Sequence, residues 1–224
     1  SVQLFSSTAA NFLNEIIATF QLTSTHAKYI QTKNNLGFGR AHNIAIQQAN
    51  SRYHLIMNPD IEINSNSIEP LISYLDQHSK TGMIVPRITR DDGELQDAYR
   101  QQLTVMDMFI RMFCKKLFPK RMAYHSLQNC DYTHPFQLPF AQGCFLLART
   151  EYLRQLGGFD ENFFMYLEDA DLCRRMNLVS KVEYVPFASV VHHWAKGSHH
   201  NLKLFKIHVK SMMYYFRKWG IQWI

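Results

Sequence analysis

One alternation of patterns between residues 27 and 57 constrains the fold of this chain more than any other feature. A short strand pattern over 27–32 is followed by a glycine-containing loop at 34–39, a helix pattern over 41–49 and a buried-strand pattern over 53–57. This order is typical of a βαβ unit in a largely parallel sheet. Loops at the carboxyl ends of such strands bind ligands. We therefore expect an α/β fold whose functional loop follows Met57.

Further patterns predict the other elements. Apolar spacing predicts a helix over about the first 20 residues, and Ser65 or Ser67 can cap a helix that runs to about Gln77. The pattern next predicts a strand over 83–85 and an apolar helix over 106–118, with Arg111, Lys115 and Lys116 on its other side. An irregular stretch over 120–139 is followed by a strand over 137–149, which contains Gly143, and by a short helix from Thr150 to Gly157. The remaining predicted elements are a helix over 168–178, strands over 182–185 and 188–192, and a final helix over 201–219. Glycine inside a strand indicates a bulge or a close approach.

Composition narrows the class of protein. The 24 Lys and Arg against 18 Asp and Glu give a net charge of +6, and 46% of residues are hydrophobic, which excludes a disordered, collagen-like or coiled-coil chain. Four separated cysteines without a C-x-x-C pair argue against a zinc site and a disulfide framework, and favour a reducing compartment such as the cytosol. No stretch approaches the roughly 20 apolar residues of a membrane span. The start lacks a signal peptide and an initiator Met, so we expect the numbering to begin inside a longer protein.

Asp60 is a candidate metal ligand. Asn58-Pro59-Asp60 directly follows the predicted 53–57 strand, which places this carboxylate at the end of that strand. Mg²⁺ or Mn²⁺ prefers oxygen ligands and is commonly held by one or two carboxylates together with the phosphates of a nucleotide. The alternative is a plain turn, because Asn, Pro and Asp are all turn formers.

His192 closes the last predicted strand, with His193 beside it and His199 and His200 shortly after. Zinc normally needs three or four ligands, and the sequence offers neither a cysteine partner nor a His-Glu-x-x-His motif. A single ligating imidazole is the functional interpretation of His192. The alternative is a partly buried structural histidine.

Glu168, Asp169 and Asp171 place three carboxylates in one helical turn. Asp171 and Arg175 are four residues apart and can pair on the helix surface, which leaves the other two carboxylates less compensated. The functional interpretation is a general base within reach of an acceptor hydroxyl. The alternative is ordinary negative charge at a helix start, which the helix dipole favours.

Two further segments carry a possible binding function. The loop over 33–43 is not a Walker-type phosphate loop, but amide side chains, an Arg and close backbone approach suit nucleotide binding at a strand-to-helix junction. The C-terminal stretch interleaves aromatic and aliphatic residues with lysines and arginines, as in helices that lie in a membrane interface. The alternative for that stretch is a helix packed on its own core with a solvated basic face.

Taken in order, these motifs resemble the family 2 glycosyltransferases, and most closely the rhamnosyltransferase-like branch of bacterial cell-surface polysaccharide synthesis. The resemblance covers about residues 33–192, and residues 157–175 are its most specific part. It is carried by Asn34-Asn35-x-Gly37-x-Gly39-x-Ala41-x-Asn43, Asn58-Pro59-Asp60, residues 143–149, Gly157-Gly158-Phe159-Asp160-Glu161-x-Phe163-Phe164-Met165-Tyr166-x-Glu168-Asp169-x-Asp171-Leu172-Cys173-x-Arg175 and Val191-His192.

The resemblance implies roles for individual residues. Asp60 matches the last Asp of the D-x-D metal motif, in which Asn58 replaces the first Asp, and His192 matches a histidine near the metal and diphosphate. Asp169 matches the catalytic base, with Glu168 beside it. The residues that fall where the family contacts the donor nucleotide are Asn34, Asn35, Gly37, Arg40 and Asn43, with Asn58 at the metal motif.

The resemblance further implies a GT-A-like, mixed and mainly parallel sheet flanked by helices. The family begins with two strands that bind the base and ribose, and neither is visible before Leu4, so we expect roughly the first two strands to be missing. We expect a transferase domain over 1–198, with a donor-binding half at 1–90 and an acceptor half at 91–198, and a basic amphipathic helix over 199–224.

The predicted activity is inverting transfer of a sugar, with L-rhamnose expected, from a dTDP- or UDP-linked donor to a lipid-linked or polysaccharide acceptor, with Mg²⁺ or Mn²⁺ as cofactor. We expect a cytoplasmic protein that is peripheral at the inner face of the cell membrane, bound through its C-terminal helix. A homo-oligomer is left open, and no nucleic-acid motif accompanies the basic charge. The alternative is a non-catalytic membrane-surface scaffold with a degenerate transferase core.

Overall fold

The computed structural model describes residues 3–4, 28–30, 32–193 and 202–224. Two short parallel strands, β1 (Gln3–Leu4) and β2 (Lys28–Tyr29), form a small sheet of their own. Helix α2 (Phe38–Gln48) then leads into the central sheet. The helix predicted over the first 20 residues lies outside the described residues, apart from positions 3 and 4, which form β1.

The central sheet has the strand order β3-β9-β5-β10-β4, with β7 paired to β10 beside this path. The path strands are β3 (Tyr53–Met57), β9 (Phe145–Arg149), β5 (Thr81–Thr89), β10 (Lys181–His192) and β4 (Ile61–Ile63). Strands β5 and β10 are parallel, and β3 runs in the same direction because both β3 and β5 are antiparallel to β9. The sheet is therefore mixed, and its three strands β3, β5 and β10 share one direction.

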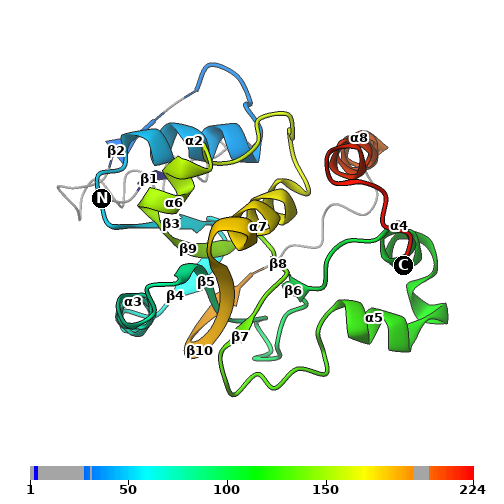
Figure 1. The fold of residues 1–224 in the computed structure, drawn as a ribbon, viewed down its shortest axis with the longest axis horizontal. Helices are drawn as coiled ribbons and strands as arrows, with labels where there is room; N and C mark the ends of the chain where they lie inside the picture. The colour runs from blue at the N-terminus through cyan, green and yellow to red at the C-terminus, as the bar shows by residue number, and fades with distance from the viewer. Residues whose placement is uncertain (1–2, 5–27, 31, 194–201) are drawn as a thin grey trace.

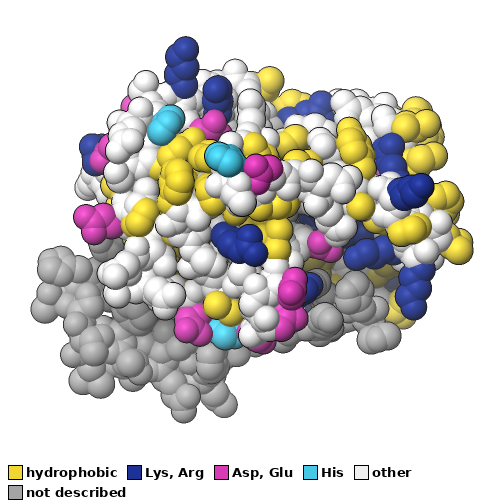
Figure 2. Space-filling model, turned by 90° about the horizontal axis from the view of Figure 1, so that it is seen from below, with side chains coloured by type: hydrophobic (Ala, Val, Ile, Leu, Met, Phe, Trp, Pro, Cys, Tyr) yellow, Lys and Arg dark blue, Asp and Glu magenta, His cyan; other side chains and the backbone are white. Residues whose placement is uncertain are grey.

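Helices cover the sheet and extend the molecule at one end. Helices α3 (Ile68–Gln77), α6 (Thr150–Gln155) and α7 (Glu168–Val179) contact the sheet strands. Helices α4 (Val105–Phe109), α5 (Pro119–His125) and α8 (Leu202–Trp219) lie with the C-terminus at the end of the molecule away from α3 (Figure 1). Hydrophobic, Lys and Arg side chains gather on the surface at this end (Figure 2).

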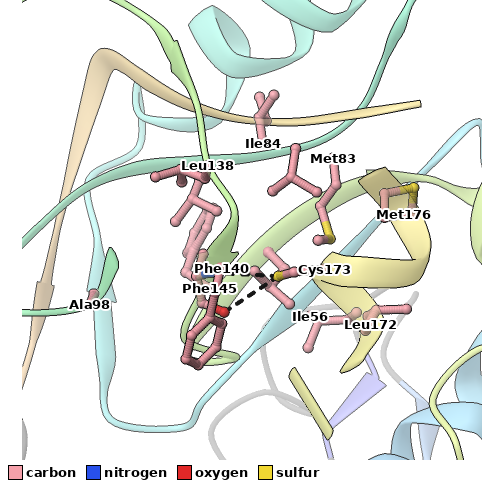
Figure 3. Packing of buried hydrophobic residues seen from close by; sticks show 14 of the residues in the cluster. Ile56, Met83, Ile84, Ala98, Leu138, Phe140, Phe145, Leu172, Cys173 and Met176 are labelled. Carbon is pink, nitrogen blue, oxygen red and sulfur yellow. Dashed lines mark hydrogen bonds between the residues drawn. The ribbon is translucent and has the colours of Figure 1, made fainter. Parts of the chain in front are cut away.

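The core lies between the sheet and its helices. Ile56, Met83, Ile84 and Phe145 from the strands are fully buried. Met83 points toward Cys173 and Met176 of α7, whereas Ile84 points to the other side of the sheet (Figure 3). The thiol of Cys173 lies within hydrogen-bonding distance of both the amide and the carbonyl of Ala141. Burial of each large side chain of this kind contributes about 1.5–3 kcal/mol. This packing holds α7 against the segment that precedes β9.

Several predicted elements are confirmed, including the α/β class. Strand β3 and helices α3, α6, α7 and α8 occur where the patterns indicate them, and all four cysteines are free thiols. Within the described residues, no helix combines the length and the apolar character needed to span a bilayer.

Other predicted boundaries are wrong, and each error has a physical reason. The strand predicted over 137–149 is three strands, β7 (Phe136–Gln137), β8 (Phe140–Ala141) and β9, because each pairs with a different neighbour. Strand β8 pairs with β6 (Tyr99–Arg100). The irregular stretch over 120–139 contains α5. The two strands predicted over 182–192 are one strand, β10, whose pairing with β5 shifts between Tyr184 and Ser189, opposite Pro86.

The apolar helix predicted over 106–118 is also divided. Helix α4 is followed by a π-helical turn, η1 (Ile110–Cys114), and a 3₁₀ turn, η2 (Lys115–Leu117). Such departures from α-helical geometry are typical of short functional or strained segments.

Helix α8 packs on the loop before α7 and on α7 itself. Nζ of Lys218 lies 2.7 Å from carboxylate oxygens of both Asp160 and Asp171, and Nε1 of Trp219 donates to Asp171 at 2.8 Å. Its Tyr215 and Phe216 are buried. One apolar face of α8 is therefore buried against the rest of the protein.

Candidate active site

The loop after β3 brings Asp60 to His192. Strands β4 and β10 pair with Ile61 opposite His192, so the residue before β4 lies beside the end of β10. Oδ1 of Asp60 is 3.2 Å from Nε2 of His192. The histidine side chain is 6% exposed and the aspartate side chain 40% exposed. Two residues that are 132 positions apart in the sequence thus meet at one edge of the sheet.

Gln96 fixes the histidine from its other side. The side-chain amide of Gln96 lies 2.9 Å from Nδ1 of His192, so the other ring nitrogen points at Asp60. Burial opposes ionisation of Asp60, but the neighbouring imidazole outweighs it, and the pKa of Asp60 is lowered. This carboxylate is therefore negatively charged at neutral pH. No sequence motif indicates Gln96, because its contact with His192 depends on the tertiary fold.

The Asp60–His192 pair fits a divalent cation. Oδ1 of Asp60 and Nε2 of His192 are buried, and neither has a hydrogen-bond partner. Two ligands at about 2.1 Å and at right angles around an octahedral ion are about 3.0 Å apart, close to the separation found here. No cluster of three His, Cys, Asp or Glu side chains suited to a metal occurs in the described part of the chain. Any Mg²⁺ or Mn²⁺ would therefore need further oxygen ligands, as phosphates or water provide.

Asp169 is held at the first turn of α7 by two backbone amides. The N–H of Gly143 donates to Oδ2 at 2.9 Å, and the N–H of Ala170 donates to Oδ1 at 2.8 Å. Burial raises the pKa of Asp169, while these amides and the charge of Arg100 oppose that rise. A side chain at Gly143 would place its Cβ 3.3 Å from both Cβ of Asp169 and the ring of Phe38. The glycine thus marks the close approach that its place in the strand pattern indicates.

Glu168 lies beside Asp169 but in a different environment. Its side chain is buried, and Oε2 has no hydrogen-bond partner. Burial, followed by repulsion from Asp169, raises the pKa of Glu168 to about 8. The two adjacent carboxyl groups therefore carry fewer than two negative charges at neutral pH, and Glu168 is the one held mainly protonated.

The turn at Gly143 and Cys144 joins the two acidic positions. The N–H of Asn58 donates to the carbonyl of Cys144 at 2.9 Å, and Gly143 donates to Asp169 as described above. Burial raises the pKa of the Cys144 thiol to about 12, and Asp169 and Asp60 both add to this rise. The fold therefore ties Asp169, and the segment that leads to Asp60, to one short turn.

The predicted donor loop is tied to the loop that precedes α7. Gly37 has φ of +80°, and a Cβ there would collide with the carbonyl oxygen of Phe164. Oδ1 of Asn35 accepts from the N–H of Gly37 at 2.9 Å. Arg40 donates to the carbonyl of Glu161 at 3.0 Å. Asn34 is exposed, and its carbonyl accepts from the hydroxyl of Thr32.

Both polar atoms of the Asn43 side chain make hydrogen bonds to other parts of the fold. Its Nδ2 donates to the carbonyl of Phe159 and to Oε1 of Glu161, and its Oδ1 accepts from the N–H of Phe159. These bonds leave its amide group engaged between α2 and the loop before α7. Direct contact of Asn43 with a nucleotide stays a prediction, as it does for Asn34, Asn35, Gly37, Arg40 and Asn58.

Basic residues that the sequence did not single out as site residues lie near Asp169. Burial and the charge of Arg111 lower the pKa of Arg100 to about 9, and Asp169 opposes this change. Burial also lowers the pKa of Arg111, and Asp169 again opposes this change. Burial, then Arg111 and Arg100, lower the pKa of His208 to about 4, and its ring lies 4.9 Å from that of Tyr166. A neutral imidazole and two guanidinium groups therefore border the acidic end of α7.

Two relatives and one solved structure resemble this chain over most of its length. The chain is 28% identical over 187 residues to the N-acetylglucosaminyl-diphospho-decaprenol L-rhamnosyltransferase of Mycobacterium tuberculosis, covering 77% of this chain and 61% of that protein. It is 28% identical over 197 residues to rhamnosyltransferase WbbL of Escherichia coli, covering 80% and 69%. The chain thus spans about three fifths of the length of the mycobacterial relative.

The crystal structure of GalNAc-T7 with UDP, GalNAc and Mn²⁺ matches with a TM-score of 0.61 at 17% identity, covering 88% of this chain and 37% of that one. At this identity the likeness shows the fold alone, which is the GT-A fold expected from the motifs. The family model for glycosyl transferase family 2 matches residues 11–157. The match covers more than half of the sequence, and the chain belongs to glycosyl transferase family 2.

Proposed function

We propose that this chain transfers a sugar, with inversion, from a nucleotide-diphospho-sugar to a hydroxyl of a lipid-linked or polysaccharide acceptor. The observation that carries the proposal is the turn at Gly143 and Cys144, which contacts both Asp169 and the residues that lead to Asp60. A base and a diphosphate-binding group on one turn are what direct displacement at a sugar carbon needs.

Asp169 is the proposed catalytic base. Its two backbone hydrogen bonds fix the carboxylate, and its raised pKa makes it a better proton acceptor than an ordinary aspartate. Asp169 accepts the proton of the acceptor hydroxyl as the hydroxyl oxygen bonds to the anomeric carbon and the bond to the diphosphate breaks. A positioned base of this kind contributes about 10²- to 10⁴-fold to the rate.

Asp60 and His192 are the proposed metal ligands. Mg²⁺ or Mn²⁺ bound there would supply positive charge to the departing diphosphate. Gln96 orients the imidazole through its other nitrogen, as outer ligands commonly do. Asn58 and the loop residues Asn34, Asn35, Gly37 and Arg40 are the proposed contacts to the donor. We further propose that residues 1–90 bind the donor and residues 91–198 bind the acceptor.

The names of the relatives support a finer assignment. Both are rhamnosyltransferases, and the mycobacterial protein is named for an acceptor that is a diphospho-decaprenol. We propose L-rhamnose as the sugar, dTDP or UDP as its carrier, and a lipid-linked acceptor at the cytoplasmic face of the membrane.

Transfer assays test this proposal directly. The protein is incubated with Mn²⁺, a panel of dTDP- and UDP-sugars and an N-acetylglucosaminyl-diphospho-polyprenol, and release of the nucleoside diphosphate is followed. We expect transfer by the wild type, and loss of at least about 100-fold in kcat for Asp169→Asn with an unchanged melting temperature. Asp131→Asn, a change at an exposed residue, is the matched control.

The outcomes separate the proposal from a non-catalytic scaffold. An active wild type with an equally active Asp169→Asn variant would remove Asp169 as the base. A folded wild type that binds neither donor nor Mn²⁺ and transfers no sugar would support the scaffold instead.

A further inference from the structure

The segment from α4 to η2 exposes an apolar stripe. Met106, Phe109, Phe113 and Leu117 recur at spacings of three and four residues, and their exposed fractions lie between 42% and 75%. The rings of Phe109 and Phe113 lie 5.2 Å apart, so they form one surface. Because Met108 and Ile110 on the same segment are buried, the stripe is additional to the residues that hold the segment to the fold. Exposed apolar patches of this kind mark interaction sites.

The C-terminal residues extend this stripe. The N–H of Val105 donates to the carbonyl of Gln222 at 2.8 Å, and that of Met106 donates to Trp223 at 3.2 Å. The tail is thereby fixed at the start of α4. Its Ile221, Trp223 and Ile224 are between 61% and 77% exposed. We call the combined surface the apolar platform, and it consists of Met106, Phe109, Phe113, Leu117, Phe118, Ile221, Trp223 and Ile224.

The platform is surrounded by positive charge. Residues 105–124 and 202–224 together hold ten of the 24 Lys and Arg residues of the chain, but only one of its 18 Asp and Glu residues. That acid, Asp107, is buried and paired with Arg121. Figure 2 shows hydrophobic and basic side chains side by side at the end of the molecule that Figure 1 labels α4 and α8. Acids from other segments pair with some of these cations, Asp160 and Asp171 with Lys218 and Asp97 with Lys115, but positive charge remains in excess on this surface.

We propose that the apolar platform docks this protein on an anionic membrane surface. Phe109, Phe113 and Leu117 would enter the headgroup and acyl boundary, and Trp223 would lie at the interface, where tryptophan is enriched. The surrounding lysines and arginines would contact anionic headgroups. The platform differs from the expected anchor, α8 itself, because it is formed by the segment from α4 to Phe118 and by the residues that follow α8.

Charge decides between a membrane and a second copy of the chain. Two platforms placed face to face would bring together two surfaces that each carry an excess of cationic residues, and like charges across an interface oppose association. An anionic lipid surface has the opposite sign. The same segment carries Arg111, whose pKa burial lowers and Asp169 raises, so the segment lies within electrostatic reach of the proposed base. In this respect the inference rests on the proposed function, since a lipid-linked acceptor would be presented from that membrane.

Vesicle sedimentation without donor or acceptor tests the inference. Vesicles of phosphatidylcholine alone are compared with vesicles containing about 30% phosphatidylglycerol, for the wild type and for Phe109→Ser/Phe113→Ser. Leu178→Ser/Phe187→Ser is the matched control, since these two apolar residues are 73% and 56% exposed outside the platform. We expect the platform variant to lose about tenfold or more in partition to anionic vesicles, and the control to bind as the wild type does.

A second measurement reports insertion itself. Brominated acyl chains should quench tryptophan fluorescence in the wild type, and this quenching should fall in Trp223→Phe. Equal binding of the platform variant and the wild type would overturn the inference. So would a wild-type dimer in gel filtration that Phe109→Ser/Phe113→Ser converts to monomer, because the occupant would then be a second copy. Transfer to a short-chain soluble acceptor is measured in parallel, so that failure of membrane docking is distinguished from failure of the proposed catalysis.

Discussion

The backbone N–H of Gly143 donates a hydrogen bond of 2.9 Å to Oδ2 of Asp169. Gly143 precedes β9, and Asp169 lies in the first turn of α7, so this bond fixes a helix start against the sheet. The next residue, Cys144, accepts a hydrogen bond from Asn58 at the end of β3. A single turn thereby sets the position of the proposed base relative to the proposed metal ligand Asp60.

Gly143→Ala should lower kcat more than it lowers stability. Its new Cβ would lie 3.3 Å from Cβ of Asp169 and from the ring of Phe38, so both must move by a few tenths of an ångström. Displacement of a catalytic group on this scale costs up to about tenfold in rate. We expect that loss in kcat with a melting temperature within about 4 °C of the wild type, by calorimetry. A variant with unchanged kcat would show that the position of Asp169 does not limit the reaction.

Glu168→Gln should stabilise the protein at alkaline pH. The pKa of Glu168 is about 8 in the folded protein against a reference value of 4.5, so between these values the folded state binds more protons than the unfolded state. The wild type is therefore expected to lose stability as pH rises from about 4.5 to about 8, and glutamine does not titrate. The melting-temperature difference should grow across this range and reach about 5 °C or more at pH 8. A difference that is constant with pH would contradict the assignment.

Asp60→Asn and His192→Asn should weaken Mn²⁺ binding in the presence of nucleotide. In the wild type, Mn²⁺ with dTDP or UDP should raise the melting temperature, because a ligand that binds only the folded state stabilises it. Both variants should lose most of this rise, and Gln96→Leu should reduce Mn²⁺ affinity by about 10- to 100-fold, because the imidazole loses its orienting partner. Glu69→Gln, at an exposed residue of α3, serves as control. An identical Mn²⁺ response in all variants would exclude these ligands.

Asn43→Ala should destabilise the fold strongly. It removes three hydrogen bonds to Phe159 and Glu161 and leaves the buried N–H of Phe159 without its partner. We expect a loss of about 2–4 kcal/mol in the free energy of unfolding, measured by urea denaturation. Asn66→Ala, at an exposed position, should change it by less than about 0.5 kcal/mol. A small effect at Asn43 with weakened donor binding would instead favour the nucleotide contact that the motif predicts.

The local sequence was sufficient for elements whose signals are short in range. Strand β3 is a compact apolar run, α6 ends before Gly157 and Gly158, and α7 begins at the acidic turn of Glu168. Segments whose form depends on distant partners were predicted poorly. The stretch over 137–149 divides because three separate neighbours pair with it, and the 106–118 helix changes its hydrogen-bond pattern and exposes apolar residues that the spacing alone would place in a core.

The sequence by itself determined the family, the acidic and histidine candidates, and the order of most helices and strands, because spacing and residue type act over a few neighbours. Only the tertiary structure decided which candidates meet. The pairing of β4 with β10 brings Asp60 next to His192, and Gly143 hydrogen-bonds to Asp169. Asn43 hydrogen-bonds to the loop before α7. These relationships depend on contacts between residues more than 20 positions apart, which a local pattern does not encode.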